Sequence, residues 1–254
     1  VSKATQQILE MHLINHPVDC PICDQAGECG LQDQYMEYGL YDSQVGKGDK
    51  VHKAKAQVIG PHVILDQERC VLCSRCVRFC DTVTGTSELG IFQRGDRAEI
   101  GIAPGKELSN PYSVNTVDIC PVGALTLKEF RFQNRVWYLK DTPSICAGCA
   151  RGCNVVVATG KQNELWTTRG QFDDRIKRLV PRENLEVNRY WICDEGRLSY
   201  KRQEAAPRLA SAQAPVGTEL DWGVAVRKAA MALKEAAEAG RAGAIFSPRM
   251  VSES

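Results

Sequence analysis

Eleven of the twelve cysteines and one histidine form three groups of four whose spacing suits metal ligation. The first group is His16, Cys20, Cys23 and Cys29, the second is Cys70, Cys73, Cys76 and Cys120, and the third is Cys146, Cys149, Cys153 and Cys193. Thiolates are soft ligands that hold iron–sulfur clusters and zinc. A disulfide framework would explain neither the repeated C-x2-C spacing nor the histidine. The sequence therefore predicts metal centres, and several clusters in one chain indicate electron transfer.

The first group has the most ambiguous chemistry. In NHPVDCPICDQAGECG, three residues separate His16 from Cys20, two separate Cys20 from Cys23, and five separate Cys23 from Cys29. Three cysteines and one histidine suit structural zinc as well as an iron–sulfur cluster. An ordinary loop histidine at position 16 is a third interpretation. The spacing by itself leaves these alternatives open.

The second group lies in a ferredoxin-like run. ERCVLCSRCVRFCD contains C-x2-C-x2-C-x3-C, in which the fourth cysteine of two-cluster ferredoxins ligates the other cluster. Cys120, followed by Pro121, stands where the fourth ligand for this cluster belongs, so an iron–sulfur cluster is favoured over zinc. By the same logic Cys80 belongs to another cluster, but NPYSVNTVDI before Cys120 contains no cysteine. We therefore expect one cluster here and a buried free thiol at Cys80.

Three arginines accompany the second group. Arg69, Arg75 and Arg78 form either a solvated basic face or a set of charges that offsets the negative charge of a thiolate-ligated cluster. The sequence does not decide between these two interpretations.

The third group combines a C-x2-C-x3-C run in SICAGCARGCNVVVAT with a distant cysteine in RYWICDEG. The segments NVVVAT and ELWTTR, separated by GKQN, predict a hairpin over which a cluster loop could fold. A zinc ribbon is the alternative, although the x3 spacing and the isolated last cysteine fit it less well.

Other elements must position these groups. Apolar spacing predicts a helix over TQQILEMHLI that Pro17 ends. ELGIFQRGDRAEIG predicts a hairpin that turns at Gly95–Asp96. Residues 203–217 indicate a linker, residues 220–240 a helix that stops near Gly240, and AGAIFS a buried strand. Such a helix followed by a strand is typical of the start of an α/β domain.

Composition narrows the class of protein. The net charge of +1 over 254 residues gives no reason to expect nucleic acid or an anionic membrane as a partner. The sequence has no apolar run that could cross a bilayer and no signal peptide. It also lacks a G-x-G-x-x-G, a P-loop and a Ser/His/Asp arrangement. Since Val1 is not a start methionine, we expect a processed or partial product. Because the cysteine pattern does not suit a disulfide framework, we also expect a reduced, intracellular chain.

Three segments together resemble the G subunit of NADH–quinone oxidoreductase, or respiratory complex I. They are HPVDCPICDQAGECGLQDQ, CVLCSRCVRFCDTVTGTSELGIFQRG and VDICPVGALTLKEFRFQNRVW, and the resemblance runs from about residue 5 to about residue 205. It implies [4Fe-4S] clusters at the first and second groups. The third group is similar to the cluster domain of molybdopterin oxidoreductases, which implies a third cluster off the main electron path and a bacterial source. The family's N-terminal [2Fe-2S] domain and most of its C-terminal domain are not in the sequence, which implies a fragment or an unusual gene boundary.

The resemblance also implies a role and a location. The chain would pass electrons from the NADH/FMN site of a partner subunit towards quinone, with no catalytic residue and no NADH, flavin, quinone or molybdenum site of its own. Its partners would be other peripheral-arm subunits, including the NADH/FMN-binding subunit and the quinone-side iron–sulfur subunits. It would lie at the cytoplasmic face of the bacterial inner membrane, without a transmembrane segment and without nucleic acid.

We expect an α+β chain in four parts. These are a histidine-plus-three-cysteine module over residues 1–60, a ferredoxin-like module over 61–138, a β-rich molybdopterin-oxidoreductase-type domain over 139–205, and a linker with the start of a truncated α/β domain over 206–254. An NAD-linked hydrogenase or an NAD-dependent formate dehydrogenase is the alternative, but these usually keep a complete two-cluster ferredoxin. A structural zinc-binding interaction module is the alternative from another class.

Overall fold

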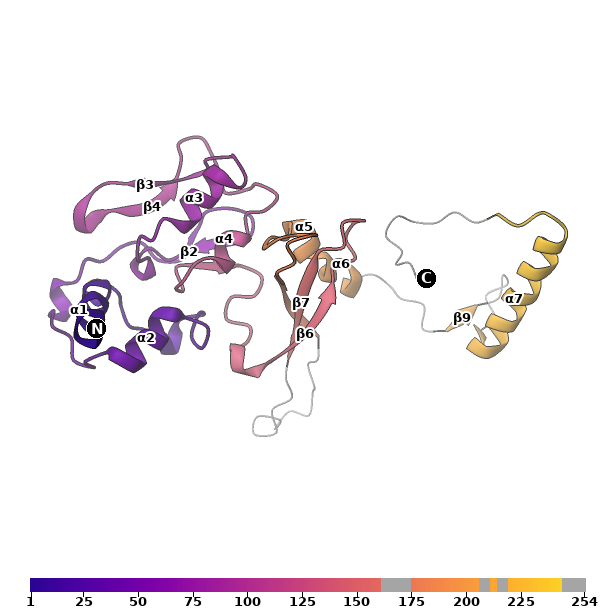
Figure 1. The fold of residues 1–254 in the computed structure, drawn as a ribbon, viewed down its shortest axis with the longest axis horizontal. Helices are drawn as coiled ribbons and strands as arrows, with labels where there is room; N and C mark the ends of the chain where they lie inside the picture. Colours follow the sequence, from indigo (N-terminus) through magenta and orange to yellow (C-terminus); the bar gives the residue numbers. More distant parts are fainter. Residues whose placement is uncertain (161–174, 206–210, 214–218, 244–254) are drawn as a thin grey trace. The chain divides into compact units, whose positions relative to one another are not determined.

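The computed structural model describes residues 1–160, 175–205, 211–213 and 219–243. The chain divides into two compact units, Val1–Cys146 with Arg151–Leu198, and Ala147–Ala150 with Ser199–Ser254. Helices and strands are mixed along the chain, which agrees with the expected α+β class (Figure 1).

Two helices form the N-terminal part of the first unit. Helix α1 spans Ser2–Leu13 and contacts α2, which spans Gly30–Tyr38. The predicted N-terminal helix is thus confirmed, and it ends before Pro17, whose ring could not continue it. The ammonium group of Lys50 donates a hydrogen bond of 3.2 Å to the carbonyl oxygen of Leu13, one of the orphan acceptors at the helix end.

A small antiparallel sheet forms the centre of the ferredoxin-like part. Its order is β1-β2-β5, with the bounds Gln57–Val58, Val63–Leu65 and Leu125–Leu127. Leu65 pairs with Leu125, and both are almost completely buried. Because β2 leads into the loop with the first three cysteines of the second group and β5 follows the fourth, this pairing brings distant ligands together. Two helices complete this part, α3 over Arg75–Thr82 and α4 over Asn115–Asp118.

The predicted hairpin is confirmed. Strands β3 over Leu89–Phe92 and β4 over Glu99–Ile102 pair antiparallel, with the short 3-10 turn Gly95–Arg97 between them (Figure 1). Leu89 and Ile100 are buried and join the core of the ferredoxin-like part. The first unit also contains 3-10 turns at Cys20–Ile22, Lys47–Asp49, Gln67–Arg69 and Val136–Tyr138.

A second antiparallel sheet follows, in the order β6-β7-β8. The bounds of its strands are Leu139–Ile145, Asn154–Gly160 and Ile176–Pro181, and α5 over Asp194–Arg197 comes after them. The strand predicted from Asn154 is confirmed as β7. Its predicted partner, residues 164–169, lies outside the described residues. The partners β6 and β8 were not predicted, because the largely exposed segment LKDTPSI lacks an alternating apolar pattern.

The second unit contains α6 over Ser199–Ala205, the strand pair β9 over Ala212–Gln213 and β10 over Glu219–Leu220, and α7 over Trp222–Glu238. Helix α7 confirms the predicted tail helix, and the Asp221 carboxylate caps its first turn by accepting from the Val224 N–H at 3.2 Å. The predicted linker was wrong at 203–205, because these residues belong to α6. Residues 212–213 are extended and form β9. The strand expected in AGAIFS lies outside the described residues beyond position 243.

None of the helices in the described ranges combines the length and the apolar character needed to span a lipid bilayer.

The buried core allows a stability test at Leu108. Its side chain is fully buried, and its N–H donates to the carbonyl oxygen of Ile59 at 3.0 Å. We expect Leu108→Ala to lower the free energy of unfolding by about 2–5 kcal/mol, because a cavity replaces the buried side chain. Guanidinium unfolding followed by circular dichroism measures this. Ile91→Ala, at a half-exposed strand position, is the control and should change stability by no more than about 0.5 kcal/mol. Equal losses in the two variants would contradict the assignment of the core.

Candidate metal centres

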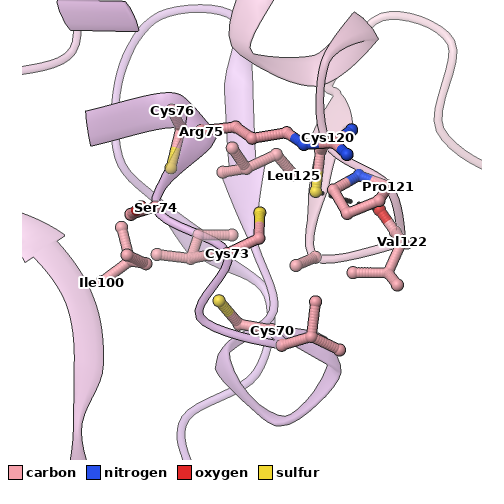
Figure 2. A pocket seen from close by; sticks show the side chains of 13 residues that line it. Cys70, Cys73, Ser74, Arg75, Cys76, Ile100, Cys120, Pro121, Val122 and Leu125 are labelled. Carbon is pink, nitrogen blue, oxygen red and sulfur yellow. Dashed lines mark hydrogen bonds between the residues drawn. The ribbon is translucent and has the colours of Figure 1, made fainter. Parts of the chain in front are cut away.

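The four cysteines of the second group line one cavity. Figure 2 shows the sulfur atoms of Cys70, Cys73, Cys76 and Cys120 turned towards a common space. Apolar side chains form much of the remaining wall, among them Leu65, Ile100, Val122 and Leu125. The structure thus brings together all four ligands that were predicted for this group.

The loop that carries the first three of these cysteines has an unusual backbone. Leu72 and Ser74 both adopt positive φ angles, 54° and 59°, and the Leu72 N–H points to the sulfur of Cys70 at 3.4 Å. Left-handed conformations cost energy for residues other than glycine, and they concentrate at functional sites. Helix α3 begins directly after Ser74 and carries Cys76, so the loop and the helix together direct the cysteines inward.

Burial raises the pKa of three thiols of this cavity, those of Cys70, Cys76 and Cys120, so they are protonated when no metal is bound. Burial raises the pKa of Cys76 to about 12 and that of Cys120 to about 11. Metal binding requires thiolates, so it must release protons from this site. A cavity lined by four cysteines and mainly apolar side chains fits an iron–sulfur cluster, whose irons prefer thiolate ligands.

The first group also lines a single cavity, formed by His16, Cys20, Cys23 and Cys29 with Gly123 beside them. Burial lowers the pKa of His16 to about 4, so its ring is neutral at pH 7 and able to bind a metal. Its Nδ1 atom is buried and has no hydrogen-bond partner in the described structure. A neutral ring with an orphaned nitrogen in a thiol-lined cavity fits a metal ligand better than an ordinary loop histidine.

Several side chains hold the first ligand loop from outside. The Arg135 guanidinium donates to the carbonyl oxygen of Cys23 at 2.5 Å and also to that of Pro21. The Asp24 carboxylate accepts from the Phe132 N–H at 2.8 Å. These contacts join residues more than a hundred positions apart in the sequence. No motif spacing connects such residues, so the sequence did not predict the contacts.

The two cavities meet at the segment that starts with Cys120. The Cys29 thiol donates to the carbonyl oxygen of Pro121 at 3.7 Å, and Gly123 lines the first cavity. A Cβ atom added at Gly123 would lie only 2.3 Å from the sulfur of Cys23. Only glycine therefore permits this approach, and the same four-residue segment carries a ligand of one site and forms part of the wall of the other.

The three arginines of the second group differ in their surroundings. Arg69 is 3% exposed and binds the carboxylate of Asp19 through Nε at 3.0 Å and Nη2 at 2.6 Å. Arg75 and Arg78 are exposed. Arg69 therefore does not belong to a solvated basic face, which was one of the two interpretations of the three arginines.

Cys80 is completely buried and is not among the residues that line the second cavity. Burial, together with the nearby charge of Glu88, raises its pKa to about 11, so it is a neutral thiol. In the ferredoxin spacing, the ligands lost before Cys120 would stand at positions 110, 113 and 116. These positions hold Asn110, Ser113 and Thr116, and all three are buried.

These three side chains have polar partners in place of a metal. The Asn110 amide donates to Glu88, and the Thr116 hydroxyl donates to the carbonyl oxygen of Ser113 at 2.7 Å. The Ser113 hydroxyl donates to the carboxylate of Asp194 at 2.6 Å. Buried polar groups are costly unless they are hydrogen-bonded, and these contacts satisfy them. Through Ser113, this region thus contacts Asp194, in the segment that follows Cys193.

Arg197 strengthens this contact. It is 2% exposed, and its Nη1 donates to the Asp118 carboxylate at 3.1 Å and to the carbonyl oxygen of Leu179 at 2.9 Å. Asp118 stands two residues before Cys120, so α5 is attached directly to the ligand segment of the second group.

The third group is brought together only in part. Cys146 and Cys153 are buried in one small core cluster, and the Cys146 N–H donates to the carbonyl oxygen of Cys153 at 2.8 Å. A Cβ atom added at Gly196 would lie 3.0 Å from the sulfur of Cys146 and 3.2 Å from that of Cys193. Cys149 is exposed and belongs to the second compact unit, so its place in this group stays a prediction.

The seven cysteines of the first two groups are all free thiols, which argues against a disulfide framework there. Within the described ranges, no three His, Cys, Asp or Glu side chains converge closely enough to hold a single metal ion.

Two family matches coincide with the two cavities. Residues 6–44 match the NADH-ubiquinone oxidoreductase-G iron-sulfur binding region, and residues 60–126 match the ferredoxin-like domain of NADH-quinone oxidoreductase subunit 3. A crystal structure of NAD+-reducing [NiFe]-hydrogenase is 28% identical and covers 52% of this chain and 57% of that one, with a TM-score of 0.45.

Curated relatives extend the match. The NADH-quinone oxidoreductase G subunit of Streptomyces coelicolor is 41% identical over 82% of this chain, and that of Mycobacterium bovis is 37% identical over 99%. The mitochondrial NADH dehydrogenase [ubiquinone] iron-sulfur protein 1 of Solanum tuberosum is 42% identical over 79%. The chain spans 23%, 30% and 26% of the length of these three relatives, respectively. From these matches and the two ligand-lined cavities, the chain belongs to the family of NADH-quinone oxidoreductase G subunits.

Proposed function

We propose that this chain is an iron–sulfur electron-transfer part of NADH-quinone oxidoreductase. It receives electrons that a partner subunit takes from NADH through FMN, and it passes them towards quinone. The observation that carries the proposal is the pair of ligand-lined cavities that meet at Cys120–Gly123. Two redox sites in such contact form a relay, which a storage or purely structural role does not require.

We assign the ligands by cavity. The first site uses His16, Cys20, Cys23 and Cys29, and the second uses Cys70, Cys73, Cys76 and Cys120. When bound, a [4Fe-4S] cluster at each site would accept and release single electrons. The chain's own contribution is to supply thiolates and one neutral imidazole, to exclude water with apolar walls, and to fix the spacing between the sites.

We assign a third cluster to Cys146, Cys149, Cys153 and Cys193. Two contacts support it: Gly196 lies beside the sulfur atoms of Cys146 and Cys193, and the Cys146 N–H donates to the carbonyl oxygen of Cys153. The modules proposed for these sites are residues 1–60, 61–138 and 139–205, followed by the start of an α/β domain over 206–254. The third site would lie beside the main electron path.

The proposed partners follow from the role. They are the other peripheral-arm subunits of the complex, including the NADH/FMN-binding subunit and the quinone-side iron–sulfur subunits. The proposed location is the peripheral arm at the cytoplasmic face of a bacterial inner membrane. The chain would hold no flavin, molybdenum, NADH or quinone itself.

The buried residues before Cys120 support this role over that of the hydrogenase and formate dehydrogenase relatives. A complete two-cluster ferredoxin needs thiolates at positions 110, 113 and 116. The asparagine, serine and threonine at these positions have no thiolate to offer, and their side chains form hydrogen bonds with other residues.

Metal analysis tests the class of cofactor. We expect brown protein with roughly four iron and four sulfide per occupied site. Colourless protein that contains zinc in place of iron would contradict the proposal and support a structural zinc-binding module.

Two cysteine variants test the ligand assignment. Cys120→Ala should abolish the EPR signal of one [4Fe-4S] cluster, because it removes a ligand of the second cavity. Cys80→Ala should keep every cluster signal, because Cys80 lies outside that cavity. EPR spectra of the reduced protein provide the measurement. Loss of a cluster in the Cys80 variant would overturn the assignment.

A glycine substitution tests the contact between the two sites. Gly123→Ala would place a methyl group against the sulfur of Cys23, so we expect loss of the first cluster, which is roughly four iron atoms per chain. Gly48→Ala is the matched control, because a Cβ atom there meets open space. Iron and sulfide analysis of both variants measures the effect. Equal iron content in the two variants would refute the close approach.

A further inference from the structure

Arg69 connects the two ligand loops. In the sequence it directly precedes Cys70, a ligand of the second site. Its guanidinium, however, binds the carboxylate of Asp19, which directly precedes Cys20 of the first site, with contacts of 3.0 and 2.6 Å. Its Nη2 also donates to the carbonyl oxygen of Ile22 at 3.3 Å, between two cysteines of the first group. The charge of Arg69 therefore lies at the first site, although Cys70, its neighbour in the sequence, belongs to the second site.

The surroundings keep this charge away from water. The Arg69 side chain is 4% exposed and that of Asp66, which lies 3.5 Å from its Nη1, is 3% exposed. Nη1 itself has no hydrogen-bond partner among the described residues. The Cδ atom of Arg69 lies 3.7 Å from a Cβ atom added at Gly123, the residue that touches the sulfur of Cys23. In such a place solvent screens a charge poorly.

Lys55 extends the pair into a network. Its ammonium group lies 3.8 Å from Asp19, 3.6 Å from Asp66 and 2.6 Å from Glu68. The two carboxylates nearest to Arg69 are therefore shared with a second, more exposed cation. Arg69 is the cation of this network that also donates a hydrogen bond to the backbone of the first ligand loop, at Ile22.

Stability alone gives a weak reason for such a network. Removing two charges from water costs about as much as their attraction returns, and apolar replacements are often equally stable. A nearby cation has a different effect on a redox group, because reduction adds a negative charge that the cation stabilises. Asp19 has the opposite effect, since its negative charge opposes reduction.

We propose that Arg69, held by Asp19, is a positioning residue that sets the reduction potential of the first cluster relative to the second. This inference rests on the proposed function. The bidentate pair fixes one ligand loop against the other, and the buried positive charge makes the first cluster easier to reduce. The potential difference between the two sites, which determines the direction in which electrons move, then depends on a residue outside both ligand sets.

Redox titration monitored by EPR tests this in the cluster-loaded protein. We expect Arg69→Gln to make the potential of the first cluster more negative, on the order of a tenfold change in its one-electron equilibrium constant, or about 59 mV. The second cluster should move less. Asp19→Asn should move the first cluster in the opposite direction. Arg94→Gln, which removes an exposed arginine near the hairpin turn, is the matched charge control and should move neither cluster.

Arg69→Lys separates charge from position. Lysine keeps the positive charge but cannot form the bidentate pair. We therefore expect the potential of the first cluster in Arg69→Lys to lie between the potentials in Arg69→Gln and in the wild type. Equal potentials in the lysine and glutamine variants would leave only a structural role and overturn the proposal. If Arg69→Gln loses the first cluster, Asp19→Asn still decides, and an unchanged potential there refutes the inference.

The wild-type spectrum separates this failure from failure of the proposed function. A cluster signal that Cys20→Ala abolishes identifies the first site. Absence of any such signal contradicts the proposed function itself, whereas an intact signal whose potential ignores both Arg69 and Asp19 contradicts only this inference.

Discussion

The close approach of two thiol-lined cavities at Cys120–Gly123 constrains much of this structure. One side of the segment carries a ligand of the second site, and the other side lies against the sulfur of Cys23 with room only for a glycine. The pairing of β2 with β5 places the segment, since Leu65 and Leu125 hold the two ends of the ligand loop together. A shift of that register would separate the cavities, because neighbouring residues of a strand face opposite sides.

The region before Cys120 is held by polar contacts. Where the ferredoxin spacing would place thiolates, Asn110, Ser113 and Thr116 form hydrogen bonds instead. Ser113 binds Asp194, the residue after Cys193. One of these positions thus attaches a part of the chain that carries the third group, while Cys80 is a buried thiol.

Local sequence predicted the local features well. The helix before Pro17, the hairpin around Gly95–Asp96, strand β7 and helix α7 are confirmed, because apolar periodicity and turn residues are short-range signals. Strands β6 and β8 were missed, and the linker was wrong at 203–205. These errors involve segments whose structure depends on pairing with distant residues rather than on their own pattern.

The ligand groups themselves were determined by the sequence, because the spacing of cysteines in a short loop limits what the loop can bind. Distances between loops are different, since they depend on how strands pair and helices pack. Only the tertiary structure could place Arg69 beside Asp19, Gly123 against Cys23, and Ser113 beside Asp194. Three arginines of identical chemistry acquired different surroundings for the same reason: burial is a property of the folded chain. The sequence thus specified the predicted ligand groups, and the fold decided which charges and contacts surround them.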